Sequence, residues 1–284
     1  MSCPLCDDTG WKPVEINGVR QVERCECWRT DAGQKRLSTA NIPRRYQHCT
    51  LANFEAYNDS LKRGVVLAQR VIDSFPGAEG GDRGLLLIGM PGVGKTHLAV
   101  AILKKCISDR AAHGLFYTTS DLMALLRSTY TGEEKATESQ VLRTMTAADV
   151  LVLDDVGRER ATEWRDEMLH LIVNTRYSER RLTIFTTNFD IGSDTTDPDT
   201  LPCRVGFRVY SRLHEMCEFI HLDAADYRER PPNATVDDLI AMWKVRNKPA
   251  LPARAARPAR AQLRESAARD GKADLRWPGG RAGS

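Results

Sequence analysis

One stretch of the sequence combines glycines, a lysine and a threonine at a spacing that suits phosphate binding: Gly89-Met-Pro-Gly-Val-Gly-Lys95-Thr96. The glycines let the backbone curl so that successive N–H groups point at a phosphate. A helix that begins at Lys95 adds the positive end of its dipole. The Lys95 ammonium can reach β- and γ-phosphates, and the Thr96 hydroxyl can bind Mg²⁺. The pattern predicts a site for a nucleoside triphosphate.

The segments on either side of this motif support the same interpretation. The apolar run Gly84-Leu-Leu-Leu-Ile-Gly89 is short enough for a buried strand, and residues 97–105 have helical spacing. Strand, glycine loop and helix is the context that a phosphate-binding P-loop requires. The alternative is a chance glycine-rich turn, which the complete motif and its flanks disfavour.

Carboxylates and an amide follow two further apolar runs. Val150-Leu-Val-Leu-Asp154-Asp155 looks like a Walker B element, a buried strand that ends in acids. We expect Asp154 to orient water around Mg²⁺ and Asp155 to polarise the attacking water. Asn188 closes the strand 182–188 as a neutral group that can position water near a γ-phosphate. The alternatives are two acids that cap a loop and a simple Asx-turn.

Three arginines, Arg204, Arg208 and Arg212, lie four residues apart in a segment, 203–216, that we predict to be one helix. That spacing would place them in one basic stripe. The stripe is either solvated or DNA-facing, or one of its arginines serves the nucleotide of a neighbouring subunit.

The order of predicted elements indicates the fold class. Apolar runs alternate with helical patterns, which favours an α/β fold with a five-stranded parallel sheet and helices on both faces. Such sheets bind ligands at the carboxyl ends of their strands, where Lys95, Asp154, Asp155 and Asn188 fall. The predicted strands are 84–89, 114–119, 148–155, 182–188 and 217–222, and the predicted helices are 60–75, 95–105, 122–130, 138–148, 163–180, 203–216 and 235–245.

Four of the eight cysteines form two close pairs near the amino terminus: Cys3 with Cys6, and Cys25 with Cys27. The Asn17-Gly18 pair between two alternating segments is a strong hairpin signal, and a hairpin would bring the cysteine pairs together. Four thiolates around Zn²⁺ would then stabilise a zinc ribbon over 1–29, which has almost no core of its own. A redox pair or an unpaired set is the alternative, and the Cys-x-Cys spacing of the second pair is less specific than Cys-x-x-Cys.

Composition limits the class of protein. The 284 residues are 42% hydrophobic and 28% charged, which is ordinary for a soluble globular protein. The apolar runs are too short for a membrane span, and the amino terminus lacks an apolar signal region. We therefore expect a cytoplasmic protein without a membrane partner.

Charge is unevenly distributed along the chain. Residues 245–284 hold ten Lys/Arg and three Asp/Glu, so this tail has a net charge of +7. The whole chain has a net charge of +3, so the remainder has −4. Ala, Arg, Pro and Gly dominate it, which predicts a disordered basic tail. It is either a DNA-binding arm or a solvated appendage. The predicted organisation is a zinc-ribbon-like module (1–29), a connector (30–59), a P-loop domain (60–230), a short helical extension (231–246) and the basic tail (247–284).

Taken together, these motifs resemble the DnaC/IstB branch of AAA+ ATPases over about residues 40–230. Ile42-Pro-Arg-Arg-Tyr46 and Asn53-Phe54 also look like that family. The segments that carry the resemblance are Gly-x-x-Gly-x-Gly-Lys-Thr-His-Leu-Ala (89–99), Leu-Val-Leu-Asp-Asp-Val-Gly (151–157), Thr-Thr-Asn (186–188) and Ser-Arg-Leu (211–213).

The resemblance implies roles for particular residues. Asp155 becomes the catalytic acid, Asn188 the sensor 1 residue, Arg212 the arginine finger and Arg228 the sensor 2 residue. Asp155 stands where many AAA+ proteins have a glutamate, which has a longer reach. The residues implied to bind ATP and Mg²⁺ are Gly89, Pro91, Gly92, Val93, Gly94, Lys95, Thr96, His97, Asp154 and Arg228.

The same resemblance implies an ATPase that is weak without partners and forms a homo-oligomer when active. One interpretation is a helicase loader that binds single-stranded DNA and a replicative helicase. A second is a transposition helper that binds duplex DNA and a transposase. A third is a nucleotide-dependent binding module with little turnover. The zinc ribbon favours the loader, because it would be a module for docking a partner.

Overall fold

The computed structural model describes residues 3–6, 9, 11–16, 19–77, 83–131, 136–159, 162–192 and 197–246, without the side chains of 16, 19, 24, 26–32 and 131. The basic tail predicted for 247–284 and the predicted Asn17-Gly18 turn lie outside these residues. No helix within them is both long and apolar enough to cross a bilayer.

The predicted α/β fold with a five-stranded parallel sheet is confirmed. Within the described residues the strand order is β4-β5-β6-β3-β7, and neighbouring strands run parallel. The end of β6 therefore lies between the ends of β3 and β5, and β7 flanks β3 on the other side. The strands are β3 (Gly84–Ile88), β4 (Gly114–Thr118), β5 (Val150–Asp154), β6 (Leu182–Thr187) and β7 (Cys217–His221).

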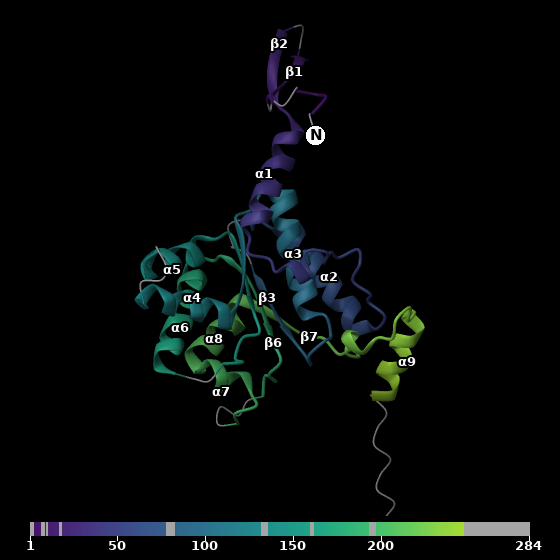
Figure 1. The fold of residues 1–284 in the computed structure, drawn as a ribbon, viewed down its shortest axis with the longest axis vertical. Helices are drawn as coiled ribbons and strands as arrows, with labels where there is room; N and C mark the ends of the chain where they lie inside the picture. Colours follow the sequence, from purple (N-terminus) through teal and green to yellow (C-terminus); the bar gives the residue numbers. More distant parts are fainter. Residues whose placement is uncertain are drawn as a thin grey trace, which may run out of the picture. The chain divides into compact units, whose positions relative to one another are not determined.

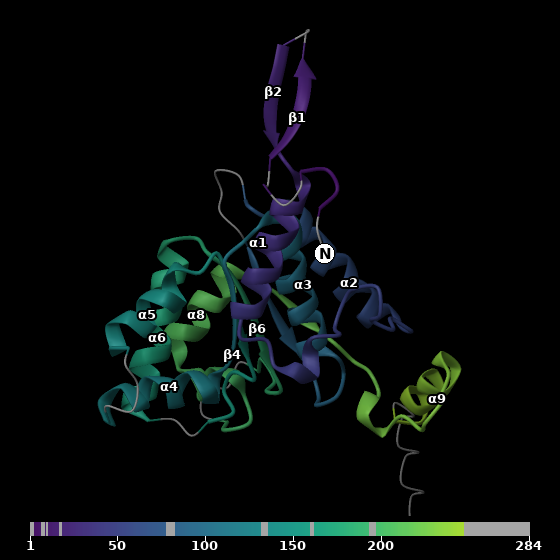
Figure 2. The same ribbon diagram turned by 45° about the horizontal axis from the view of Figure 1, so that its top comes forward.

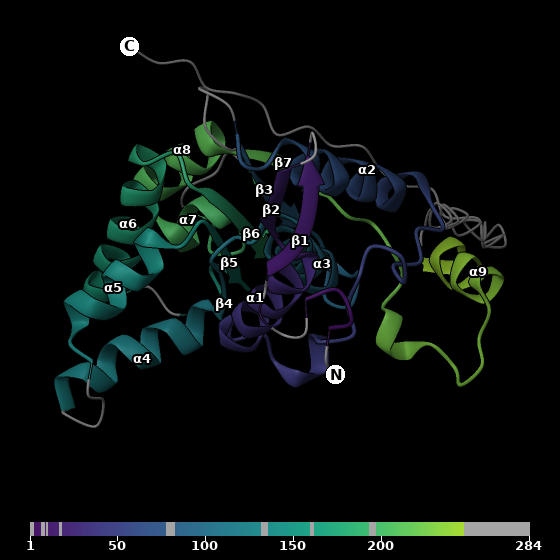
Figure 3. The same ribbon diagram turned by 90° about the horizontal axis from the view of Figure 1, so that it is seen from above.

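Both faces of the sheet are buried, because alternate strand residues enter two different hydrophobic clusters. Leu85 and Leu87 pack on one side, with α2 and α3, and Leu86 and Ile88 pack on the other. Figure 3 shows α6, α7 and α8 across the sheet from α2 and α3. Burial on both faces explains why the strands read as continuous apolar runs. The helices are α2 (Asp59–Ser74), α3 (Lys95–Arg110), α4 (Thr119–Thr131), α5 (Glu138–Ala147), α6 (Glu163–Ser178), α7 (Leu201–Val205) and α8 (Phe207–Met216).

The amino-terminal segment forms the predicted hairpin and then a helix. Strands β1 (Trp11–Ile16) and β2 (Val19–Arg24) pair antiparallel, and α1 (Glu26–Thr39) follows directly. The helix lies alongside α3 (Figures 1 and 2), and Gly33 faces Ser108 there. The sequence analysis assigns 30–59 to a connector and predicts no helix there, so the part of α1 within it is a correction. The sequence did not reveal α1 because its residues are largely polar.

The segment predicted as one helix over 203–216 is two helices. Gly206, with φ of 78°, ends α7 and begins α8, so the helical periodicity restarts there. The prediction of a single basic stripe is therefore wrong, because Arg204 belongs to α7 while Arg208 and Arg212 belong to α8. Beyond β7 the chain forms the short 3-10 helix η2 (Tyr227–Glu229) and then α9 (Val236–Arg246), where a helical extension is predicted.

Candidate nucleotide site

The glycine loop joins β3 to α3 in the predicted manner. Gly94 precedes the first residue of α3 with φ of 98°, and Gly92 has φ of 80°, both in the region that favours glycine. A Cβ on Gly94 would lie 2.7 Å from the Phe54 ring, and one on Gly92 would lie 1.7 Å from Asp226 Oδ1. Both glycines are thus required by backbone conformation and by close approach of other segments.

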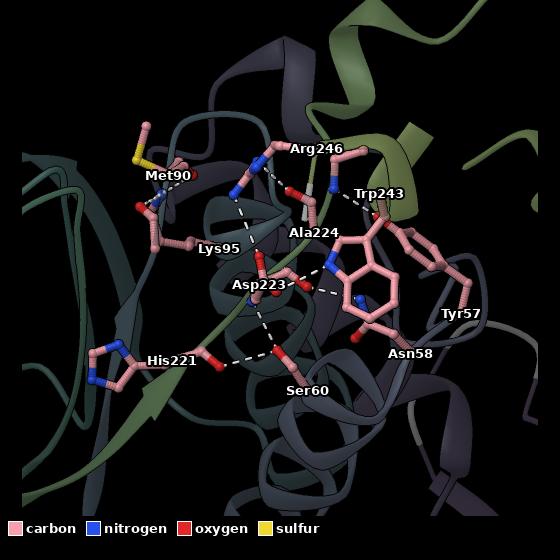
Figure 4. A network of polar contacts seen from close by, with 12 residues as sticks. Tyr57, Asn58, Ser60, Met90, Lys95, His221, Asp223, Ala224, Trp243 and Arg246 are labelled. Atoms are coloured by element: carbon pink, nitrogen blue, oxygen red, sulfur yellow. Dashed lines mark hydrogen bonds and ion pairs between the residues drawn. The ribbon is translucent and has the colours of Figure 1, made fainter. Parts of the chain in front are cut away.

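The Lys95 side chain is folded against its own loop. Its Nζ donates hydrogen bonds of 2.8 Å to the carbonyl oxygens of Gly89 and Met90, and the residue is 7% exposed (Figure 4). Burial lowers the pKa of the Lys95 ammonium to about 8, and the charges of Asp154 and Asp155 partly oppose this shift. The ammonium is therefore still largely protonated at neutral pH and is fixed at the loop that would hold phosphate.

Asp154 is held by hydroxyl groups from two other elements. Its Oδ1 accepts hydrogen bonds from Thr96 Oγ1 at 2.9 Å and from Thr186 Oγ1 at 2.7 Å. Burial raises the pKa of this carboxyl, and the two hydroxyl donors oppose the increase. Thr96 and Asp154, predicted as the magnesium pair, thus meet in the structure, and their oxygens suit a hard cation.

Thr186 is a positioning residue that sequence analysis did not single out. Its hydroxyl donates to Asp154 and also accepts the backbone N–H of Asp155 at 2.9 Å. It therefore fixes both acids from the adjacent strand. The signal in the sequence is a run of threonines at the end of an otherwise apolar strand, where a buried hydroxyl needs a partner.

Asp155 points to different partners from those of Asp154, because its backbone is left-handed with φ of 60°. Its Oδ1 accepts a hydrogen bond of 2.7 Å from Asn188 Nδ2, so the predicted pair of acid and amide is in contact. Its Oδ2 lies 3.0 Å from the Arg158 guanidinium. Nothing in the sequence marks Arg158, since an exposed arginine in the loop after a strand is ordinary.

The segment after β7 lies on the P-loop. Tyr227 N donates to the Gly92 carbonyl at 3.1 Å, and Asp226 caps η2 by accepting the Arg228 N–H at 2.9 Å. The positive charge of Arg228 is close enough to lower the pKa of Lys95 further. Arg228 thus lies in a segment that contacts the P-loop, and its role as the sensor 2 residue stays a prediction.

The remaining loop residues have separate surroundings. His97 Nε2 donates to Thr50 O at 2.9 Å and to Asn53 Oδ1 at 3.0 Å, and its ring packs edge-on against Phe54. Burial lowers the pKa of this imidazole. His97 therefore ties the segment 50–54 to α3, while Val93 is buried and Pro91 is exposed.

Arg212 is not among the residues gathered at the strand ends. Its guanidinium carbon lies 4.4 Å from the centroid of the Tyr177 ring, and its Nη1 lies 3.8 Å from Glu215 Oε1. Tyr177 OH also donates to Glu215. These contacts place Arg212 on the surface where α6 and α8 meet.

Three of the four predicted zinc ligands lie together. The Sγ atoms of Cys3, Cys6 and Cys25 are within 4.8 Å of one another, and those of Cys3 and Cys25 are 3.7 Å apart. Tetrahedral zinc with Zn–S bonds of ~2.3 Å requires sulfur atoms about 3.8 Å apart, so this donor set fits zinc. Cys27 is in the first turn of α1, and its side chain lies outside the described residues.

The fold and site together define a class of protein. A P-loop after β3, two acids at the end of β5 and an asparagine after β6, on a sheet of this order, constitute an AAA+ ATP-binding domain. A family model described as IstB-like ATP binding protein matches residues 22–231, and the chain belongs to this family.

Individual relatives are similar over part of the chain. The replicative helicase loader DnaC of Buchnera aphidicola subsp. Schizaphis graminum (strain Sg) is 28% identical over 160 residues, which cover 55% of this chain and 62% of the relative. The chain thus spans about three fifths of the curated relatives that it matches.

Two solved structures share the fold. The crystal structure of the DnaC helicase loader is 34% identical, with a TM-score of 0.56 over 63% of this chain and 99% of that chain. The crystal structure of DnaI is 25% identical, with a TM-score of 0.53 over 66% and 94%. The predicted membership of the DnaC/IstB branch is confirmed by these findings.

Proposed function

We propose that this protein is an ATP-hydrolysing helicase loader that binds a replicative helicase and single-stranded DNA. The observation that carries the proposal is the cluster at the strand ends, where Lys95, the Thr96–Asp154 pair and the Asp155–Asn188 pair meet on one edge of the sheet. The likeness to DnaC, which is described as a replicative helicase loader, supports the choice of partner.

The geometry supports separate roles for these residues in ATP hydrolysis. Lys95 compensates phosphate charge, and Thr96 with Asp154 would hold Mg²⁺, which neutralises charge on the β- and γ-phosphates. Asp155 and Asn188 would orient the attacking water, with Asp155 accepting its proton. Arg228 stands beside the P-loop as a further cation for phosphate.

Arg212 is proposed to act on the nucleotide of a neighbouring subunit. Its described partners, Tyr177 and Glu215, lie on the α6–α8 surface, and a guanidinium there would meet ATP across a subunit interface. An arginine supplied in trans stabilises charge on the transferred phosphoryl group. The active protein is accordingly proposed to be a homo-oligomer.

Mixing two inactive variants tests the role of Arg212. Arg212→Ala and Lys95→Ala should each hydrolyse little ATP, whereas mixed assemblies should regain part of the activity. In those assemblies an intact Arg212 faces an intact Lys95. Assemblies that form without any recovery would exclude Arg212 as a finger in trans.

Single-stranded DNA is the favoured nucleic acid because of a cluster that pairs aromatic rings with an arginine. Trp164 Nε1 donates to Tyr130 OH at 3.4 Å, and the Arg127 guanidinium carbon lies 5.0 Å from the Trp164 ring centroid. Tyr130 is 63% exposed. Unpaired bases stack on such platforms with about 1–3 kcal/mol per base. Tyr130→Ala should weaken binding of a fluorescent oligonucleotide, whereas Val66→Ala, on α2, should not.

The zinc-ribbon-like module over 1–29, which contains the hairpin, is proposed to bind zinc through Cys3, Cys6, Cys25 and Cys27. The clustered thiols of the first three support the proposal. Zinc would stabilise the hairpin as a docking module for the helicase.

Loading onto circular single-stranded DNA tests the function directly, because a closed helicase ring cannot thread onto a strand without ends. The replicative helicase of the same organism should become bound to the circle only with this protein and ATP. Lys95→Ala should fail in this assay. If the same amount of helicase binds the circle with and without this protein, the loader function is contradicted.

A transposition helper is the second candidate, since the matching family model carries the IstB description. Preferential binding of duplex over single-stranded DNA and stimulation of a transposase would favour it. A nucleotide-dependent binding module is the third candidate, and steady-state hydrolysis that stays negligible with DNA and helicase would favour that one.

A further inference from the structure

The segment 222–228 brings Asp226 and Arg228 to the P-loop; residues 222–226 are irregular backbone after β7, and Arg228 lies in η2. Leu222 N still donates to the Ile88 carbonyl at 2.8 Å, which continues the sheet for one residue. Beyond it the segment leaves the sheet, so its polar groups need other partners. Those partners determine how firmly Asp226 and Arg228 are held against the P-loop.

The start of α2 supplies partners for the backbone of this segment. Asn58 Nδ2 donates to the Asp223 carbonyl at 2.7 Å, and Asp223 N donates to Ser60 Oγ at 2.8 Å. Ala225 N donates to Tyr57 OH at 2.8 Å. Asn58 also caps α2 by accepting the Leu61 N–H, so the same residue is fixed on both sides. One face of the segment is therefore anchored to the core of the domain.

Helix α9 supplies partners on the other side. Trp243 Nε1 donates to Asp223 Oδ2 at 3.0 Å, and Arg246 Nη2 lies 3.3 Å from Oδ1 (Figure 4). Arg246 Nη1 donates to the Ala224 carbonyl at 2.7 Å. Asp223, Trp243 and Arg246 form a clasp that joins the carboxyl-terminal helix to the segment that contacts the P-loop.

We infer that α9 is a positioning element of the nucleotide site: through the clasp it holds residues 222–228 against the P-loop and so sets the affinity for ATP. This inference rests on the proposed ATP site. Two residues downstream of Ala224 the segment reaches Gly92, within the loop that binds phosphate. A shift of Asp223 therefore moves Asp226 and Arg228, while Asp155 and Asn188, which directly follow β5 and β6, keep their geometry.

Asp223→Asn tests the clasp with little change in shape, because both backbone hydrogen bonds of Asp223 remain. ATP should bind about fivefold more weakly, the factor expected for one hydrogen bond of ordinary net strength. The KM for ATP should rise while kcat stays within a factor of about two, since the hydrolytic pair is untouched. Arg246→Gln should have a similar effect, and the double variant should lose no more than either single one.

The matched control is Asp73→Asn, at the other end of α2, where the carboxylate contacts only Gln69 among the described hydrogen bonds. It should bind ATP like the wild type. A loss that came from general destabilisation would instead lower the melting midpoint and kcat as well as the affinity.

Coupling must also operate in the reverse direction, because linkage is reciprocal. In the full-length wild-type protein, a slowly hydrolysed ATP analogue should slow hydrogen exchange of the α9 amides, and in Asp223→Asn it should not. If the variants bind ATP like the wild type, and the nucleotide does not change hydrogen exchange of the α9 amides in the wild type, the proposed role of the clasp is wrong while the ATP site stands. A wild-type protein that binds no nucleotide would overturn both the clasp and the ATP site.

Discussion

The nucleotide site and the amino-terminal cysteine cluster differ in what surrounds them. Asp154 accepts hydrogen bonds from the hydroxyls of Thr96 and Thr186, whereas the amino-terminal thiols lie beside a hairpin with an exposed surface. Asp154 is 6% exposed, while Trp11 and Val22 of the hairpin are 46% and 69% exposed. Burial in a two-sided core positions the first group without any ligand. The hairpin has little core of its own, so we propose that zinc holds the cysteines beside it in place.

The sharpest way to test this contrast is to remove one thiol. Cys6→Ser should lose bound zinc and leave residues 1–29 open to proteolysis, since structural zinc contributes about 10–16 kcal/mol in small fingers. Nucleotide binding by the core should persist. The control is Cys203→Ser, which changes a cysteine of α7 outside the cluster; this variant should bind as much zinc as the wild type. Elemental analysis that finds equal zinc in Cys6→Ser and wild type, or none in wild type, would contradict the zinc site.

A smaller but still large loss of stability is expected where the core buries a cation. Arg176 is fully buried and makes hydrogen bonds with the Met145, Ala148 and Leu182 carbonyls. Burial lowers its pKa to about 9. Arg176→Met should lower the free energy of unfolding by about 3 kcal/mol, because buried carbonyls lose their donor. Urea denaturation measures this, with exposed Arg63→Met as the control. A change below about 1 kcal/mol would show that the carbonyls find other partners.

Thr186 should matter for catalysis rather than folding. Thr186→Val keeps the shape but removes the hydroxyl that fixes both acids, so hydrolysis should fall about tenfold with ATP affinity little changed. Thr186→Ser, which restores the hydroxyl, should recover most of the rate. Equal rates for Val and Ser at this position would rule out the positioning role.

Sequence analysis succeeded where burial produces a strong pattern. The strands of the sheet and the polar residues that follow them, such as Lys95 and Asp154, are marked by apolar runs that end abruptly. It failed at α1, whose polar surface hides its helical period, and at Gly206, whose φ breaks one predicted helix into two. Thr186 and the clasp of Asp223 with α9 depend on contacts between distant segments, which spacing along the chain does not reveal.

A smaller effect is expected at Arg158. Its ion pair with Asp155 is largely exposed, and such pairs contribute about 0.2–1 kcal/mol. Arg158→Gln should free one carboxylate oxygen and raise the hydrolysis rate about twofold without changing ATP affinity. A slower variant would indicate that Arg158 assists the reaction instead of restraining Asp155.

The central claim is that one edge of the sheet binds ATP and hydrolyses it through separate residues. Comparing Lys95→Ala with Asp155→Asn, by nucleotide titration and single-turnover hydrolysis in the presence of DNA, tests this claim most directly. Lys95→Ala should lose ATP binding, because the phosphate charge is no longer compensated. Asp155→Asn should bind ATP like the wild type and hydrolyse it at least about 100-fold more slowly, since only the group that accepts the proton of water is lost. If both variants bound and hydrolysed ATP at wild-type levels, the site assignment would be wrong.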